Sequence, residues 1–515
     1  MWVPSTIAFR RWPIVVIPLL TFILWHAATI YNATDEFPSS SSSKPASDYL
    51  SWLPSGLKHP GFDPSSHHVF IATQPNWHEQ VWLTIGGMLS SLKVPYTAYT
   101  ECDDTAEGET CIRFGLLEMA AVLGVWNGGP VKKKSELFND VNKPLPNGKY
   151  VDTVILATEK EDFQWGSERL LQLWNERPDG QKFKVVGVYH EPTGDLEHYS
   201  RQWAHTGALS YLTLSPHVAA DLKHRLRIDA ARPEGGAVGV DHIPVRTVVP
   251  WMPAADHGVY VPEDKGGMVT RLEHTLPTRI VINGMISPER RGYDRVFDDM
   301  KRLFLEDAKL FGYRWSETES LFVPIDKDDP NTFKLLLLGE TDVRVDRPDP
   351  GTVREAVEFI SGYSQGEFYQ YMASADLMLL AWNDAFRYLD SQASSSAFTT
   401  LETEVPLVIT PGIEEQYSFL DSSISVIRPN ALREMDVVAL FRKFPNAARM
   451  TYTELERQLR ELYSAETMHL RTVPLVIRML KDGWKRSPGS WKSKKAALRH
   501  EQERVLIEIL SEPFY

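Results

Sequence analysis

Two neighbouring arginines in this chain have the chemistry and the position to bind an anion. Arg290 and Arg291 lie at the start of a predicted helix, after an apolar strand that ends at Gly284. The free N–H groups and the dipole of a helix start favour negative charge. Arginine adds forked donors that suit a diphosphate. The alternative is that both arginines are solvated side chains at an ordinary helix start.

Three serines and one histidine extend this set of candidates. Ser394, Ser395 and Ser396 open another predicted helix, where they could hold a phosphate or sugar or simply cap the helix. His190 begins the sequence HEP directly after the apolar run 183–189, at the expected carboxyl end of a strand. Its ordinary pKa of about 6.5 suits proton transfer. A lone histidine in a turn can equally be structural.

The elements that must position these residues alternate along the chain. Near-continuous apolar runs such as 68–73, 183–189 and 279–283 are separated by stretches with helical periodicity. Such runs are typical of parallel strands that are covered on both faces. The sequence therefore predicts an α/β fold with two doubly wound Rossmann-like domains. Their expected bounds are 67–268 and 269–480, and a final helix in 481–515 is expected to pack back across both.

Composition excludes several classes of protein. The chain has 515 residues, of which 43% are hydrophobic and 24% charged, as expected for a globular protein with more than one domain. Its net charge of −13 argues against a nucleic-acid-binding protein, which needs a basic face. Two cysteines are too few for a disulfide scaffold or a four-cysteine zinc site.

The N-terminal residues predict a membrane anchor. Residues 1–11 read as a cytoplasmic tail, 12–34 as a transmembrane signal-anchor and 35–66 as a serine- and proline-rich stem. The 23 residues of 12–34 span about 34 Å as a helix, which is enough to cross a bilayer. A cleaved signal peptide is the alternative. The anchor implies a single-pass type II protein of the Golgi or ER membrane with a luminal body.

The two cysteines flank an acidic segment, CDDTAEGETC. In an oxidising lumen we expect a disulfide between Cys102 and Cys111; two free, buried thiols are the alternative. No acidic pair follows an apolar strand as a metal motif would, because Asp328 and Asp329 lie in a polar loop. We therefore expect no metal.

Four segments in the second half occur in an order that resembles the nucleotide-binding domain of GT-B glycosyltransferases, particularly glycosyltransferase family 4. They are IVINGMISPERRGYDRVF, KLLLLGE, VEFISGYSQGEFYQYMASADLMLLA and SSSAFTTLETEVPLVIT. The resemblance covers about 130 residues. It implies that two Rossmann-like domains face each other across a cleft.

The resemblance also implies an activity and roles for named residues. A sugar would move from a nucleotide-diphosphate sugar to a hydroxyl on a glycan, lipid or protein, with retained anomeric configuration. Gly284, Arg290, Arg291, Ser394 and Ser395 would bind the donor, and His190 would be catalytic. The matching carboxylate, Glu402, would hold the nucleotide ribose, although it could instead pair with a basic neighbour at the end of a helix.

The chain departs from the family pattern at three places. Ser394 stands where the family commonly has the first of two glutamates, and Met285 stands where it often has an arginine. The segment QPNWHEQ replaces the glycine-rich loop after the first strand. A non-catalytic glycan- or nucleotide-binding protein of the same fold is therefore a second hypothesis.

Overall fold

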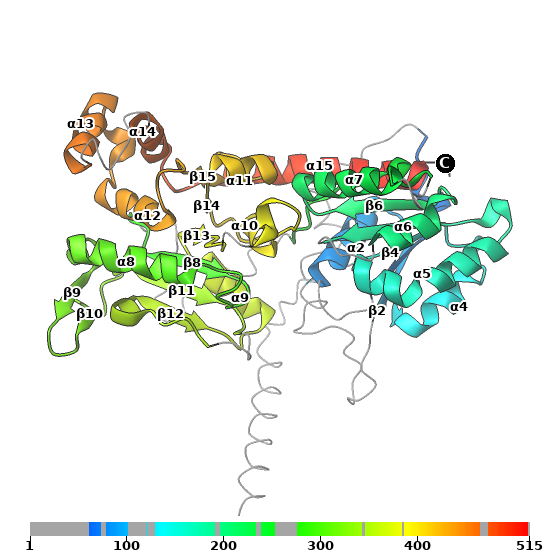
Figure 1. Ribbon diagram of the computed structural model, residues 1–515, viewed down its shortest axis with the longest axis horizontal. Helices are drawn as coiled ribbons and strands as arrows, with labels where there is room; N and C mark the ends of the chain where they lie inside the picture. Colours follow the sequence, from blue (N-terminus) through cyan, green and yellow to red (C-terminus); the bar gives the residue numbers. More distant parts are fainter. Residues whose placement is uncertain are drawn as a thin grey trace, which may run out of the picture. The chain divides into compact units, whose positions relative to one another are not determined.

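The structure is a computed structural model that describes residues 61–73, 79–100, 120, 129–190, 196–232, 238–252, 275–341, 346–383, 386–463 and 472–512 (Figure 1). All of them belong to one compact unit, Gly56–Tyr515. The predicted tail, anchor and most of the stem lie outside the described residues, as do Cys102 and Cys111. Among the described residues, no helix has both the length and the hydropathy needed to cross a bilayer.

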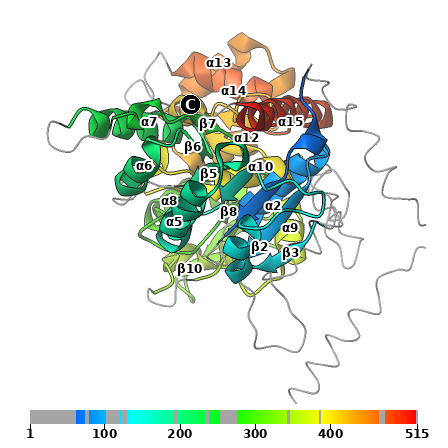
Figure 2. The ribbon, with the colours of Figure 1, turned by 90° about the vertical axis from the view of Figure 1, so that its right-hand side faces the viewer.

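The first half of the described chain forms a seven-stranded parallel sheet with the order β3-β2-β1-β4-β5-β6-β7, which Figure 2 turns toward the viewer. The strands are β1 (Val69–Ala72), β2 (Tyr96–Thr100), β3 (Val131–Lys133), β4 (Thr153–Leu156), β5 (Lys184–Tyr189), β6 (Leu209–Thr213) and β7 (Val245–Thr247). The five central strands are almost entirely buried, whereas the edge strands β3 and β7 are mostly of intermediate exposure.

The helices that connect these strands are α2 (Glu79–Ser91), α4 (Leu137–Val141), α5 (Glu159–Glu176), α6 (Leu196–Ala204) and α7 (Pro216–Ala230). Local sequence favours their starts: α7, for example, has Pro216 in its first turn, where a proline needs no hydrogen-bond acceptor. Close packing between a helix and the sheet also restricts the size of one strand residue. A Cβ at Gly187 in β5 would lie 2.8 Å from the ring of Phe163, so α5 can approach the sheet only because this residue is glycine.

The second half forms a six-stranded parallel sheet with the order β12-β11-β8-β13-β14-β15. The strands are β8 (Arg279–Asn283), β11 (Lys334–Leu338), β12 (Val357–Ile360), β13 (Leu377–Leu379), β14 (Leu407–Ile409) and β15 (Ser425–Ile427). The helices are α8 (Tyr293–Asp307), α9 (Gln365–Ala373), α10 (Ser395–Thr403), α11 (Pro411–Gln416), α12 (Glu434–Lys443), α13 (Tyr452–Leu462), α14 (Val473–Asp482) and α15 (Pro488–Ser511). Two parallel sheets confirm the predicted α/β class.

Some elements differ from the sequence prediction. An antiparallel hairpin, β9 (Tyr313–Ser316) and β10 (Leu321–Pro324), follows α8 and was not predicted. The helical pattern of the sequence extends over 293–311, but the helix is α-helical only to Asp307 and its last turn is a 3-10 helix. β7 lies inside residues 229–268, a stretch whose sequence PEGGAVG and several prolines favour a loose junction between domains. β7, β9 and β10 have only three or four residues each, which is too few to show a strand pattern.

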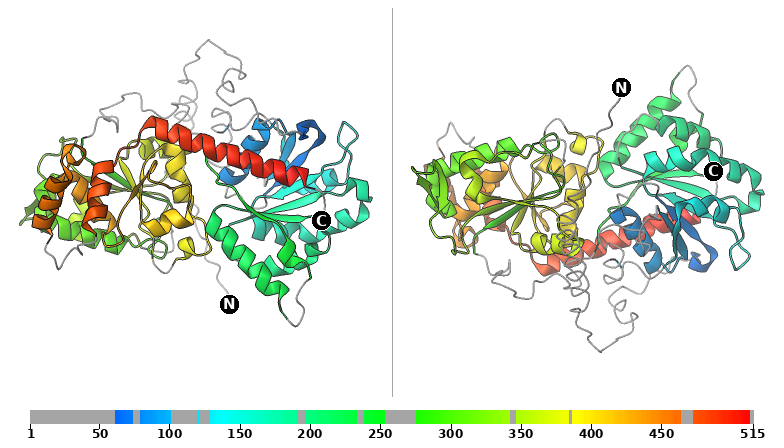
Figure 3. Two further views of the ribbon diagram at one scale, coloured as in Figure 1. Left: turned by 90° about the horizontal axis from the view of Figure 1, so that it is seen from above. Right: turned by 90° about the horizontal axis from the view of Figure 1, so that it is seen from below.

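Alternate residues of each strand point to opposite faces of the sheet and pack in different apolar clusters. In the second sheet, Ile280 and Ile282 pack with α8, α12 and α14, whereas Val281 packs on the other face with α9 and α10. That second face shares one apolar cluster with the first sheet and with α15, which contributes Trp491 and residues 505–510. Figure 3 shows α15 as the long red helix that extends alongside elements of both sheets. The predicted terminal helix is therefore present.

Candidate functional site

Each sheet has a point where the chain order reverses. In the second sheet the chain leaves β8 for β11 and β12 on one side and returns to β13 on the other. In doubly wound sheets, ligands bind outside the carboxyl ends of the strands at such a switch point. The residues here are Asn283 at the end of β8, Gly284 after it, and Leu380 and Ala381 after β13.

Gly284 lies at this switch point in a conformation that side chains disfavour. Its φ is +112°, and a Cβ would lie 2.9 Å from Nη2 of Arg291. Gly339, at the end of β11, is more constrained still, because a Cβ there would lie 1.9 Å from the carbonyl oxygen of Gly284. Two backbones therefore meet without side chains between them at the ends of β8 and β11.

Arg291 is buried at this edge, with 4% of its surface exposed. Its Nη1 donates to the Leu380 carbonyl, and its Nη2 donates to the Asn283 carbonyl at 2.9 Å and to Ser396 Oγ at 2.7 Å. Burial lowers the pKa of Arg291. The guanidinium thus ties together the ends of β8 and β13 and the start of α10, so in this structure protein atoms occupy the donors that we predicted for a diphosphate.

Arg290 differs from its neighbour, because its side chain is exposed. The guanidinium lies 5.6 Å from the ring centroid of Phe386, and the backbone carbonyl accepts from the N–H of Asn383. Within the described part of the chain, no carboxylate lies within 4.0 Å of this guanidinium. Of the two predicted arginines, Arg290 is the one placed to meet a ligand.

The three serines are at the start of α10, as predicted, but they have different surroundings. Ser394 is the N-cap residue, and its N–H donates to the hydroxyl of Tyr417 at 3.1 Å. Ser395 is exposed. Ser396 is fully buried and donates from Oγ to the Asn283 carbonyl at 3.0 Å. Ser395 therefore presents its hydroxyl at the surface, whereas Ser396 fixes the helix start to β8.

Glu402 lies in the last turn of α10 with 2% of its surface exposed. One oxygen accepts from the N–H of Met252 at 3.1 Å, and the other accepts from the Tyr369 hydroxyl at 3.2 Å. Burial raises the pKa of Glu402 to about 7, against the two hydrogen bonds and the charge of Lys495, which lower it. Instead of an open ribose site, the carboxyl group contacts the segment that joins the two sheets.

The switch point of the first sheet lies between β1 and β4. Thr73 and Thr158 follow these strands, with their hydroxyl oxygens 3.5 Å apart. His190 follows β5, and its Nε2 lies 2.8 Å from the carbonyl oxygen of Ala157, so Nε2 donates and the ring has a fixed orientation. Burial lowers the pKa of His190 to about 4. The ring is therefore neutral at pH 7, unlike the titrating histidine that we predicted.

Backbone and side-chain contacts join the carboxyl edges of the two sheets. The N–H of Ala393, just before α10, donates to the His190 carbonyl at 3.5 Å. His217, near the start of α7, uses both ring nitrogens, with Nδ1 3.0 Å from the Gln416 carbonyl and Nε2 3.2 Å from the Gln392 carbonyl. The backbone of His190 thus lies next to the segment that leads into α10.

Helix α15 contacts both halves of the described chain. It contacts the first sheet through Lys184, whose Nζ donates to the carbonyls of Ile509 and Leu510 at 2.7 and 2.9 Å. It contacts the second half through Lys495, whose Nζ lies 2.8 Å from Glu404. The charges of Lys495 and Arg499 each lie 5.5 Å from the ring of Trp251, in the segment between the sheets.

Several functional neighbours were missed by sequence reasoning. His217 follows a serine and a proline, a signal for a helix start that carries no information about its distant partners. Tyr417 and Glu434 were also missed; the Tyr417 hydroxyl donates to the Tyr388 carbonyl, and a Glu434 carboxylate oxygen accepts from the Ala381 N–H at 3.1 Å. Within the described residues, no group of three or more His, Cys, Asp or Glu side chains could hold a metal.

No protein-family model matches the chain, and no curated protein matches it significantly. Among solved structures, an alpha-glucosyltransferase in complex with UDP-glucose and DNA containing an abasic site is 11% identical, with a TM-score of 0.42 over 84% of this chain and 99% of that one. An alpha,alpha-trehalose-phosphate synthase (UDP-forming) from Burkholderia vietnamiensis is 10% identical, with a TM-score of 0.38 over 86% and 99%. The glycotransferase of kitacinnamycin is 13% identical, with a TM-score of 0.35 over 86% and 99%.

Proposed function

We propose that this protein is a glycosyltransferase that moves a sugar from a nucleotide-diphosphate sugar to a hydroxyl group on a glycan, lipid or protein. The observation that carries the proposal is that the carboxyl edges of the two sheets contact each other. The Ala393 N–H donates to the His190 carbonyl, and the ring of His217 contacts the carbonyls of Gln392 and Gln416. Each sheet also has a reversal of chain order. A transferase for two substrates needs two such ligand edges that face each other.

The donor side of the proposed site is the switch point of the second sheet. Gly284 lets the backbone of a ligand-facing loop approach closely, and the start of α10 offers N–H groups to an anion. Arg290 is the exposed cation beside it. As a sugar leaves, negative charge grows on the diphosphate, and a cation at this place stabilises that charge in the transition state. Arg291 acts indirectly, by holding the loops in position.

The opposite side of the proposed site contains His190. Because burial lowers its pKa to about 4, the ring is neutral and can hydrogen-bond a sugar hydroxyl without charging. We propose that it orients a substrate and does not cycle through the charged form. Its bond to the Ala157 carbonyl fixes which nitrogen carries the proton.

Finer features of the proposal come from the sequence resemblance alone. We propose membership of glycosyltransferase family 4, retention of anomeric configuration and catalysis without a metal. Ribose binding by Glu402 would require the carboxyl group to exchange its present bonds with Met252 and Tyr369. We also propose that residues 12–34 anchor the protein in the Golgi or ER membrane and that Cys102 and Cys111 form a disulfide in the lumen.

One observation favours a second candidate, a non-catalytic glycan- or nucleotide-binding protein. The polar atoms of Arg291 and Glu402 already have protein partners, and the family's first carboxylate is replaced by Ser394. A chain of this kind could bind a donor without promoting its cleavage. Transfer and binding must therefore be measured separately.

The test uses the purified full-length protein with a panel of UDP-, GDP- and ADP-linked sugars. A ligand that binds only the native state raises the melting temperature, and about 100 times Kd adds about 2.7 kcal/mol. Arg290→Gln should weaken the binding of the active donor at least tenfold, as expected for a lost charge-assisted bond of about 1.5–3 kcal/mol. Arg314→Gln, on the exposed hairpin strand β9, is the matched control.

Release of nucleoside diphosphate from the bound donor then separates the two candidates. Steady turnover with an acceptor supports the transferase, and donor binding without any turnover supports the binding protein. No binding of any nucleotide sugar at millimolar concentration would refute the transferase and the nucleotide-binding form of the second candidate.

A further inference from the structure

A hollow of about 170 Å³ lies at the carboxyl edge of the second sheet, between the starts of α8 and α12. Three arginines and two carboxylates contribute to its lining: Arg295, Asp299, Arg428, Arg433 and Glu434. We call it the arginine hollow. It adjoins the end of β13, because Arg295 Nη2 donates to the Trp382 carbonyl at 3.3 Å and Glu434 accepts from the Ala381 N–H.

Both carboxylates of the arginine hollow are already engaged. Asp299 lies 2.6 Å from Nη1 of Arg433, and Glu434 lies 3.7 Å from Nη2 of Arg295. Glu434 also accepts the backbone hydrogen bond from Ala381. These pairs match two of the three arginines, which leaves a surplus positive charge at the third, Arg428.

Arg428 is the unusual member of the set. Its Nη1 donates to the Leu432 carbonyl, but its buried Nε has no hydrogen-bond partner. In the described part of the chain, no carboxylate lies within 4.0 Å of its guanidinium. Burial lowers its pKa, yet arginine keeps its charge in proteins. Glu434 and Asp436 attract this charge only from beyond that distance, so an anion in direct contact would stabilise the partly desolvated cation further.

The surroundings of Arg428 add to the attraction for an anion. The hollow includes the start of α12, a helix of ten residues whose positive dipole end lies at Glu434. Arg428 also lines a second hollow of about 240 Å³, whose lining is partly apolar (Ile427, Leu475 and Met479) and partly charged (Glu414, Arg478, Asp482 and Arg486). Arg428 thus borders two spaces.

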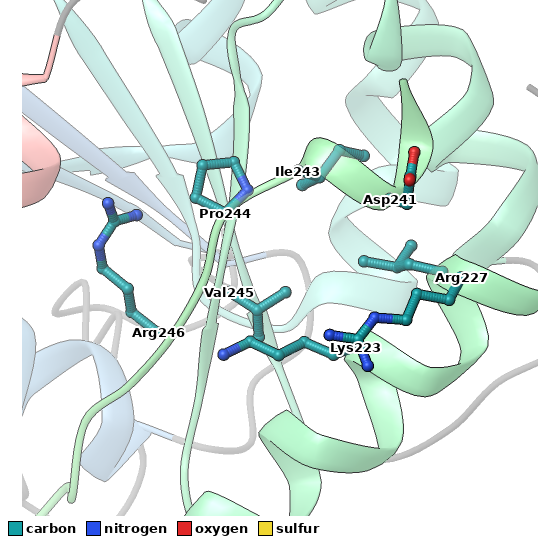
Figure 4. Close-up of a pocket in the computed structure, with 8 residues that line it drawn as sticks. Lys223, Arg227, Asp241, Ile243, Pro244, Val245 and Arg246 are labelled. Carbon is teal, nitrogen blue, oxygen red and sulfur yellow. The ribbon is translucent and has the colours of Figure 1, made fainter. Parts of the chain in front are cut away.

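Another basic hollow in the molecule lacks this property. It has a volume of about 370 Å³ and lies between α7 and β7 (Figure 4). Figure 4 shows Lys223 and Arg227 extending from α7, with the guanidinium of Arg246 directed away from them. Lys223 and Arg227 are exposed, and Arg246 pairs with Glu508 and Glu512. Although Nη1 of Arg246 is buried without a hydrogen-bond partner, its guanidinium has two carboxylate partners, and the other two cations are exposed to solvent, so the charges there are compensated without a ligand.

We propose that the arginine hollow binds a phosphoryl group, with Arg428 as the residue that the anion neutralises and Arg295 and Arg433 as its flanking donors. Its volume suits one phosphate and is too small for a whole nucleotide. The phosphoryl group belongs either to the diphosphate of the proposed donor or to a separate phosphate-bearing ligand. The binding site itself does not depend on the proposed transferase activity.

The experiment measures the binding of inorganic phosphate and of UDP to the full-length protein by calorimetry, at constant ionic strength. We expect millimolar or tighter binding of phosphate, weakened at least tenfold by Arg428→Gln, which removes one charge-assisted contact of about 1.5–3 kcal/mol. Arg428→Lys should retain part of the affinity, and Arg314→Gln should change it less than twofold.

The UDP measurement distinguishes the two sources. If Arg428→Gln weakens UDP binding to the same extent, the hollow holds a phosphate of the donor; if it weakens only phosphate binding, the ligand is separate. Phosphate binding by a protein that binds no nucleotide would support the hollow while refuting the proposed function. No phosphate binding to the wild type, or equal losses in Arg428→Gln and Arg314→Gln, would overturn the proposal.

A stability measurement keeps the proposal testable if Arg428→Gln folds poorly. Phosphate should raise the melting temperature of the wild type and leave that of Arg428→Met unchanged. Without phosphate, Arg428→Met should be as stable as the wild type or more stable, because it removes an unpaired, partly buried charge. A clear loss of stability in phosphate-free buffer would instead assign Arg428 a structural role and overturn the proposal.

Discussion

The buried carboxyl group of Glu402 should make the stability of this protein fall as pH rises. Its pKa is about 7 in the folded protein, against an ordinary value of 4.5. Between these values the unfolded chain has lost the proton and the folded chain still holds it, so stability decreases from pH 4.5 to about 7 and is then level. At about 1.4 kcal/mol per pH unit, this interval corresponds to about 3 kcal/mol.

Glu402→Gln tests this reasoning, because the amide is neutral at every pH and can still accept from the Met252 N–H. Urea unfolding of both proteins should give similar free energies at pH 5. At pH 8 the variant should be more stable than the wild type by about 3 kcal/mol. Glu415→Gln, an exposed residue of α11, should show no such dependence.

The quantity to compare is the difference between wild type and variant, since other groups titrate equally in both. A difference that stays constant from pH 5 to pH 8 would mean that Glu402 titrates normally. A difference that grows with the opposite sign would mean that an ionised carboxylate stabilises the junction of the two sheets. Either result would refute the geometry described for Glu402.

Three further predictions concern the same edge of the molecule. Gly339→Ala should lower the free energy of unfolding by at least about 2 kcal/mol, because the new Cβ would overlap the Gly284 carbonyl. Gly180→Ala, where a Cβ meets open space, should change the free energy of unfolding little. Equal effects of the two substitutions in urea unfolding would contradict the close approach of the two backbones. Arg291→Lys should lower the free energy of unfolding by about 2–4 kcal/mol, because the buried carbonyls of Leu380 and Asn283 lose their donors. The same change at the exposed Arg290 should lower it by less than about 0.5 kcal/mol, and thermal unfolding of both variants measures the difference. The ring of His190 should titrate near pH 4 in NMR spectra, so its contribution to stability is present above pH 6.5 and is lost as pH falls toward 4; a midpoint near 6.5 would show that the ring is solvated.

The sequence predicted the sheets better than it predicted the site. Apolar runs identify β1, β5 and β8 because both faces of these strands are covered, so nearly every residue must be apolar. Strands of three residues such as β3, with the sequence VKK, contain too few positions to show any pattern. The alternation of strands with helices then predicted parallel, doubly wound sheets, whereas the order of the strands in each sheet comes from the structure.

The candidate site residues were selected from short sequence motifs, but their surroundings depend on residues that lie far away in the sequence. Nothing in the pair Arg290 and Arg291 indicates which side chain is buried; the carbonyl of Leu380, 89 residues away, decides it. Glu402 meets Met252 across 150 residues, and His217 meets Gln416 across 199. Such partners are set by packing, which local periodicity does not record.

The position of α15 bears on how the chain reaches its native state during synthesis. Trp491 and residues 505–510 complete an apolar cluster that also contains Val69 and Trp82 from the first elements of the described chain. Domains usually fold in the order in which they leave the ribosome. Here the earliest sheet exposes part of its apolar face until the final helix emerges. A protein chain truncated before Pro488 would therefore leave this apolar face uncovered and would be bound by chaperones and degraded by proteases.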